Sequence, residues 1–106
     1  MRYLMTSFGD GSIPDEKQFE EMDKFMAELS ASGVLLAAGG LEPGGVHVMS
    51  QDGEFTVTDG PFAEAKEAAG GFALVEVSSR EEAVELARRA AAIGGNGTTI
   101  IQQVFG

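Results

Sequence analysis

Apolar and polar positions along this chain follow two different periods. Residues 2–8, 34–38, 72–77 and 98–105 are short, β-prone apolar runs bounded by glycine-rich or polar segments, and such runs predict strands. Two further β-prone runs, 46–50 and 55–59, flank Asp52-Gly53. Asp-Gly is typical of a tight hairpin turn, because both residues accept positive φ. The pattern therefore predicts four strands and an inserted hairpin at about residues 46–59.

Two segments show the spacing of amphipathic helices. The first has apolar residues at intervals of three, four and seven: Phe19, Met22, Phe25, Met26 and Leu29. Asp15 and Gln18 predict a capping box at its start, and Gly33 predicts a left-handed residue at its end. Residues 63–69 contain good helix formers but predict only one or two helical turns.

The second helix is predicted to start at a capping box formed by Ser79 and Glu82 and to close at the glycines of residues 94–97. Its predicted buried face is made of small and aliphatic side chains: Ala83, Val84, Leu86, Ala87, Ala90 and Ala91.

The order of these elements predicts one α+β domain over residues 1–106, a ferredoxin-like βαββαβ fold with an inserted β-hairpin. Both helices would cover one face of the sheet. Apolar residues nevertheless occur at both parities of the strands at 72–77 and 98–105, so both sheet faces are expected to be buried. We expect a second copy of the chain to cover the other face, which makes a homodimer.

Charge and composition narrow the classes of partner. Asp and Glu total 17 against 7 Lys and Arg, for a formal net charge of −10. Such a surface repels phosphates, so neither nucleic acid nor a membrane is an expected partner. There is no cysteine, the first residues are too short an apolar run for a signal peptide, and no long apolar segment follows. We therefore expect a cytoplasmic protein without a disulfide framework.

Several motifs together resemble the YCII-related family, and more narrowly its DGPF-motif branch. They are Tyr3-Leu4-Met5, Gly39-Gly40-Leu41, the run from Val57 to Glu67 that contains Asp59-Gly60-Pro61-Phe62, and Gly70-Gly71-Phe72. The resemblance spans essentially the whole chain. It implies a dimeric α+β barrel, in which two sheets face each other around a cleft. Members of this branch are often associated with extracytoplasmic-function sigma factors, which implies a regulatory role as readily as a catalytic one.

Asp59 is the leading candidate for chemistry, since it begins the signature run at the end of a predicted strand. A carboxylate beside a cleft would serve as a general base. The alternative is a structural role, because an Asp two residues before Pro61 is also a natural turn or helix-capping residue.

The single histidine, His47, would form an acid–base pair with Asp59 if both lay on one face of the hairpin. With Asp52-Gly53 as the turn, His47 pairs with Thr58, and neighbouring residues alternate between faces. The register therefore places His47 and Asp59 on opposite faces, unless a one-residue bulge reverses the alternation.

Five further residues are candidates for ligand binding. Lys66 would attract an anionic ligand at the mouth of the cleft, or it belongs to a solvated short helix. Phe62, Phe72 and Tyr3 would line the cleft or simply fill the core. Gly60 lies between Asp59 and this aromatic part of the signature run.

No metal or cofactor is expected, because one histidine without cysteine leaves only carboxylates, and no glycine loop has a nucleotide-binding spacing. Two functions remain open at this point. The first is cofactor-independent acid–base chemistry on, or binding of, a small and partly apolar metabolite in the dimer cleft. The second is a non-catalytic regulatory or interaction module whose acidic surface engages a protein partner, such as a sigma factor.

Overall fold

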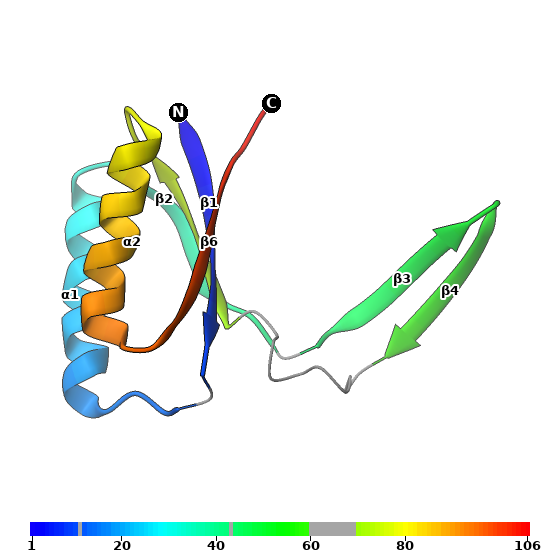
Figure 1. Cartoon of the computed structure of the whole chain (residues 1–106), viewed down its shortest axis with the longest axis horizontal. Helices are drawn as coiled ribbons and strands as arrows, with labels where there is room; N and C mark the ends of the chain where they lie inside the picture. The colour runs from blue at the N-terminus through cyan, green and yellow to red at the C-terminus, as the bar shows by residue number, and fades with distance from the viewer. Residues whose placement is uncertain (11, 43, 60–69) are drawn as a thin grey trace.

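A computed structural model describes residues 1–10, 12–42, 44–59 and 70–106 of the chain, and these residues form two sheets and two helices (Figure 1). The strands are β1 (Arg2–Gly9), β2 (Leu35–Gly40), β3 (Val46–Gln51), β4 (Glu54–Asp59), β5 (Gly71–Glu76) and β6 (Gly97–Gln103). The helices are α1 (Glu16–Ala31) and α2 (Arg80–Gly94). The short helix predicted at 63–69 lies outside the described residues.

The main sheet has four antiparallel strands in the order β2-β5-β1-β6, and β3 and β4 form a separate sheet. Strand β5 lies between β2 and β1, and β1 lies between β5 and β6, which is the strand order of a split βαβ fold. Both helices lie side by side on one face of this sheet (Figure 1). The predicted ferredoxin-like α+β fold is thus confirmed. Neither described helix combines the length and the apolar character needed to cross a bilayer.

Helix α1 begins and ends where its local sequence predicts. The Asp15 carboxylate accepts a hydrogen bond from the Gln18 backbone N–H at 2.8 Å, and the Gln18 side-chain oxygen accepts from the Asp15 N–H at 2.9 Å. Two orphan donors of the first turn are satisfied in this way. Gly33 follows the last turn with φ 81°, a conformation that glycine adopts at little cost.

Helix α2 starts at Ser79, although only half of the predicted capping box forms. The Ser79 hydroxyl oxygen accepts from the Glu82 N–H at 3.1 Å. The Glu82 carboxylate instead accepts hydrogen bonds from the hydroxyl and the backbone N–H of Ser78. These bonds, the hydroxyl first, lower the pKa of Glu82 because they stabilise its charged form.

The core lies between the helices and the sheet. It consists of eight buried side chains: Tyr3, Met5, Phe25, Leu29, Val75, Val77, Ala83 and Leu86. On the strands these are odd-numbered positions, as expected where one face of each strand meets the helices. Three side chains predicted for the buried helix faces are exposed instead, namely Phe19, Val84 and Ala91. They lie at the margins of the helix stripes, where the sheet no longer covers them.

The opposite face of the main sheet, which we call the open face, is covered by no described helix or strand. Cross-strand register places six residues at its centre, in two rows: Leu74, Leu4 and Gln102, then Phe72, Thr6 and Ile100. Four of the six are large and apolar, and Ile100 is 44% exposed. The predicted apolar character of both sheet faces is therefore present in the structure.

Strands β3 and β4 form a protruding hairpin, which we call the arm (residues 46–59). Asp52 and Gly53 have φ 52° and 82°, the two positive values of a type I′ turn, as predicted. The pairs Gln51–Glu54, Met49–Thr56 and His47–Thr58 form without a bulge, so His47 and Asp59 point to opposite faces. The inference against a His47–Asp59 pair is confirmed.

The arm extends away from the main sheet, on the side opposite the helices (Figure 1). Its two strands contact each other and make no extended contact with another described element. The Cα radius of gyration is 15.7 Å. A compact chain of this length has a value of about 13 Å, and the difference reflects the projecting arm.

Candidate functional site

A half-open pocket of about 540 Å³ lies between the helix layer and the main sheet. Met22, Phe25 and Met26 of α1 form one wall, and Ala87 and Ala90 of α2 form another. The alanines leave the space open because they carry no atoms beyond Cβ. Methionine and phenylalanine walls favour a flat or flexible apolar molecule, because both side chains offer polarisable surface.

The floor of the pocket comes from strand positions that face the helices. Met5 and Val75 belong to it, together with the cross-strand pair Ser7 and Thr99. These two hydroxyl groups and the carboxylate of Asp23 on α1 are the polar side chains among the described lining residues. A mainly apolar pocket with a few polar groups is the usual form of a small-molecule site.

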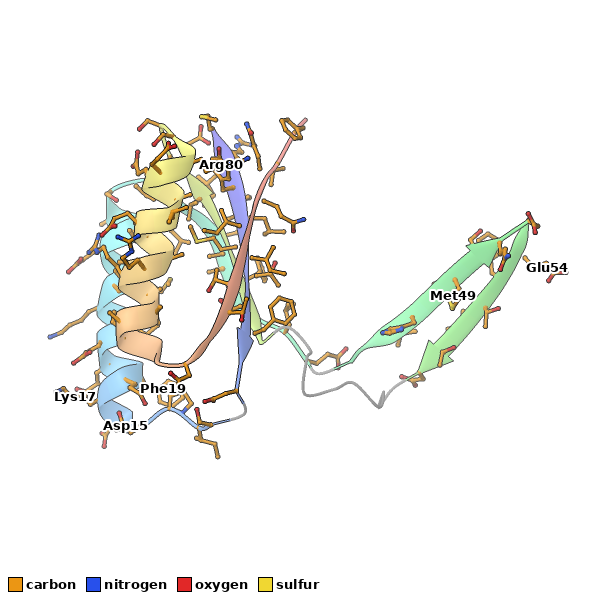
Figure 2. The ribbon with its side chains drawn as sticks, viewed as in Figure 1. Asp15, Lys17, Phe19, Met49, Glu54 and Arg80 are labelled. Carbon is orange, nitrogen blue, oxygen red and sulfur yellow. The ribbon has the colours of Figure 1, made fainter. Side chains whose placement is uncertain are left out.

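Glycines surround the mouth of the pocket, at the end of β2 and the start of β5. Gly70 donates its N–H to Ser7 O at 2.7 Å and accepts from Leu41 N at 3.2 Å. A Cβ on Gly71 would lie 3.1 Å from Gly39 O, so the two backbones approach closely here. Phe19, 56% exposed, lies on α1 at the same end (Figure 2). The mouth is therefore lined mainly by backbone.

The pocket was not predicted from the sequence, although one signal was present. Ser7 has the same parity as Tyr3 and Met5, so it is a polar residue at a position that faces the helices. Asp23 on α1 is exposed while also lining the pocket. A polar side chain on an otherwise apolar strand face is the signal that could have indicated the site.

The predicted site residues lie in several places. Asp59 is the last residue of β4, exposed at the base of the arm, and it pairs with Val46. Phe72 lies on β5 beside the pocket mouth, but its side chain belongs to the open face, where its ring approaches Gly39 so that a Cβ there would be only 3.1 Å away. Tyr3 is 1% exposed within the core, which is the second of the two roles left open for it. Gly60, Phe62 and Lys66 lie outside the described residues.

The described residues contain no group of three or more His, Cys, Asp or Glu side chains arranged to hold a metal ion. In the chain the arm lies between Gly40 of β2 and Gly71 of β5, two glycines that line the pocket. The arm is thus inserted between the two strand ends at which the pocket opens. The described residues form an α+β domain with a largely apolar pocket at that end of the sheet.

Three comparisons place this domain among known proteins. The YCII-related domain matches residues 1–104, so the chain belongs to the YCII-related family. The uncharacterized protein R00369 of Rhizobium meliloti (strain 1021) is 34% identical over 97 residues, which cover 83% of this chain and 78% of that protein.

A similar solved structure is the 5-chloro-2-hydroxyhydroquinone dehydrochlorinase TftG of Burkholderia phenoliruptrix AC1100, in complex with 2,5-dihydroxybenzoquinone. The TM-score is 0.53 at 15% identity, over 99% of this chain and 94% of that one. At this level of identity the similarity shows a shared fold. The fold is shared over nearly the full length of both chains.

Proposed function

We propose that this chain is a homodimeric member of the DGPF-motif branch of the YCII-related family. It binds a small, partly apolar molecule and acts on it by acid–base chemistry without a cofactor. The observation that carries the proposal is the pocket of about 540 Å³, whose walls are apolar and whose floor offers Ser7 and Thr99. This volume suits a single-ring or two-ring molecule, since ligand pockets typically measure about 300–1,000 Å³.

Asp59 is the proposed proton acceptor. It leads the signature run, and it is the exposed last residue of β4, at the base of the arm that is inserted between two pocket-lining glycines, Gly40 and Gly71. A second copy of the chain on the open face would form the cleft that the family resemblance implies, on the side of the sheet toward which the arm extends (Figure 1). Closure would remove water around the carboxylate, which strengthens its interaction with a bound molecule.

Filling the pocket should weaken binding. Ala90 lines the pocket, so Ala90→Trp would place a large ring in the space, whereas Ala92 is exposed on the same helix and does not line it. We expect Ala90→Trp to raise the Kd of a bound molecule at least tenfold and Ala92→Trp to leave it within twofold. The first probe is 2,5-dihydroxybenzoquinone, followed by other small phenols and quinones, with calorimetry as the measurement. Equal affinities in the two variants would place the site elsewhere.

Neutralising Asp59 should weaken binding as well. Removing one partner of a charge-assisted hydrogen bond typically costs about 1.5–3 kcal/mol, which corresponds to roughly a tenfold to hundredfold higher Kd. We therefore expect the Kd to rise by that factor in Asp59→Asn and to stay unchanged in Glu54→Gln. Glu54 is an acidic residue at the far end of the same strand (Figure 2). Loss of affinity in Asp23→Asn but not in Asp59→Asn would instead assign the role to the carboxylate that lines the pocket.

A second candidate function is a regulatory module that binds a basic segment of a protein partner, such as a sigma factor. The exposed side of α1 supports it, because that side carries Glu16, Glu20, Glu21, Asp23 and Glu28 against two lysines. A basic partner should elute from the immobilised protein between low and moderate salt, because screening weakens exposed charge pairs. If no partner is retained even at low salt, this second function is wrong.

A further inference from the structure

The arm is amphipathic, and its apolar face is exposed. Directly paired residues share a face, which puts Val46, Val48, Phe55 and Val57 on one side of the hairpin. They are 56%, 64%, 74% and 66% exposed. Ser50 near the turn and Asp59 at the base lie on the same side. The opposite side carries mainly polar residues, with Met49 as its one large apolar side chain. An alternating pattern of this kind is that of a strand pair with one buried and one solvated face.

An isolated two-stranded hairpin is at best marginally stable in water, so the arm needs a surface on which to pack. Its own main sheet does not supply that surface, because the arm extends away from it and makes no extended contact with the described helices or strands (Figure 1). The arm does, however, leave the sheet on the same side as the open face.

The open face has the matching character and size. Six residues per strand at about 3.4 Å each give the arm a length of about 20 Å, and four strands at about 4.8 Å give the main sheet a width of about 19 Å. The centre of the open face offers an apolar surface on which the arm could pack. Its large apolar side chains are Leu4, Leu74, Phe72 and Ile100. No charged residue lies in the two central rows, so the net charge of −10 creates no repulsion there.

We propose that the arm is a clasp between two copies of this chain: its apolar face packs on the open face of the second copy, and the second copy's arm packs on this one. The proposal rests on the homodimer put forward above and specifies how it is held. A second copy is the occupant because one chain carries both uncovered apolar surfaces, and a two-fold axis then buries both pairs at once.

The exchange of two arms buries four surfaces, two on each copy. An arm about 20 Å long and 10 Å wide covers about 200 Å² of the second copy's open face, so each copy contributes roughly 400 Å² in projection, half from its arm and half from its open face. Accessible area exceeds projected area, and a standard interface takes about 800 Å² from each partner. Neither the arm nor the open face alone reaches that size.

Cross-linking tests the arrangement directly, because the chain has no cysteine of its own. Two single variants, Val57→Cys and a mass-tagged Ile100→Cys, are mixed, unfolded, refolded together and treated with a short bismaleimide. We expect a product that joins the two chains, with a yield several-fold above that of Met49→Cys with Ile100→Cys. Met49 is the matched control because it is similarly exposed, at 61%, on the other face of the arm. Equal yields would overturn the proposed packing.

A double variant, Val57→Cys with Ile100→Cys in one chain, separates the clasp from a fold-back. A dimeric cross-linked product supports the clasp, and an internally linked monomer contradicts it, since the arm would then cover its own sheet.

Light scattering on the unmodified chain separates this proposal from the homodimer. We expect a dimer whose dissociation constant rises at least tenfold in Phe55→Ser and stays within twofold in Met49→Ser. A monomer would overturn both the homodimer and the clasp. A dimer that is insensitive to Phe55→Ser and gives no specific cross-link would overturn the clasp and leave the homodimer standing.

Discussion

Replacing Phe25 by alanine is expected to lower the free energy of unfolding by about 3–5 kcal/mol, the usual cost of emptying a buried aromatic site. Phe25 is 5% exposed at the centre of the α1 stripe, among the buried side chains of both sheet and helices. The Arg89 guanidinium of α2 also lies 4.7 Å from the centre of its ring, so the substitution removes a contact between the two helices as well. Urea denaturation followed by circular dichroism measures the loss.

The matched control is Phe19, six residues earlier on the same helix and 56% exposed. Phe19→Ala should change stability by less than about 1 kcal/mol, because its ring already contacts water. The free energy of unfolding of a domain of this size is roughly 5–15 kcal/mol. Only the Phe25 variant should therefore be close to unfolded at physiological temperature. Similar losses in the two variants would contradict the assignment of the core.

Replacing Gly97 by alanine is expected to cost roughly 1–3 kcal/mol, the range for a residue forced into a sparsely populated backbone region. Gly97 begins β6 with φ 156°, where side chains other than hydrogen are rarely found. A Cβ there would also lie 2.7 Å from the Phe8 carbonyl oxygen of β1, too close for two nonbonded atoms. The backbone of the β1–β6 pair would have to shift, since no side chain is available to move.

Gly40→Ala is the control for this effect. The nearest described atom to a Cβ at Gly40 would be Gly70 O, at 3.8 Å, which is ordinary contact distance. The φ angle of Gly40 is not positive, so alanine fits there without backbone strain. We expect the thermal midpoint to fall by several degrees in the Gly97 variant and to change little in the Gly40 variant. A reversed order would mean that the close approach of β6 to β1 is not as described.

Local features of the fold were predictable because they depend on residues close together in the chain. Asp52-Gly53 determines the hairpin turn and, with it, the whole register of the arm. Asp15 and Gln18 cap α1 as expected, because both partners lie within one turn. Strand ends were less well predicted. Strand β5 covers residues 71–76 rather than 72–77, and β6 ends at 103 rather than 105, since strand ends depend on neighbouring strands.

The candidate site was predicted less completely, for a physical reason. The pocket forms where Ala87 and Ala90 of one helix face Met22 and Met26 of the other, and no local pattern reports the space that small side chains leave. The two possible roles of Tyr3 likewise depended on distant residues, because its burial requires both helices to lie over β1.

Sequence patterns were sufficient for the element order, the helix starts, the hairpin register and the apolar character of both sheet faces. These follow from local backbone preferences and from the alternation of side chains along strands. Three features were decided only by the packing of elements that lie far apart in the chain. They are the pocket between the helices and the sheet, the burial of Tyr3 in the core, and the position of the arm, which does not cover its own sheet. Such packing depends on side-chain volumes that meet only in three dimensions.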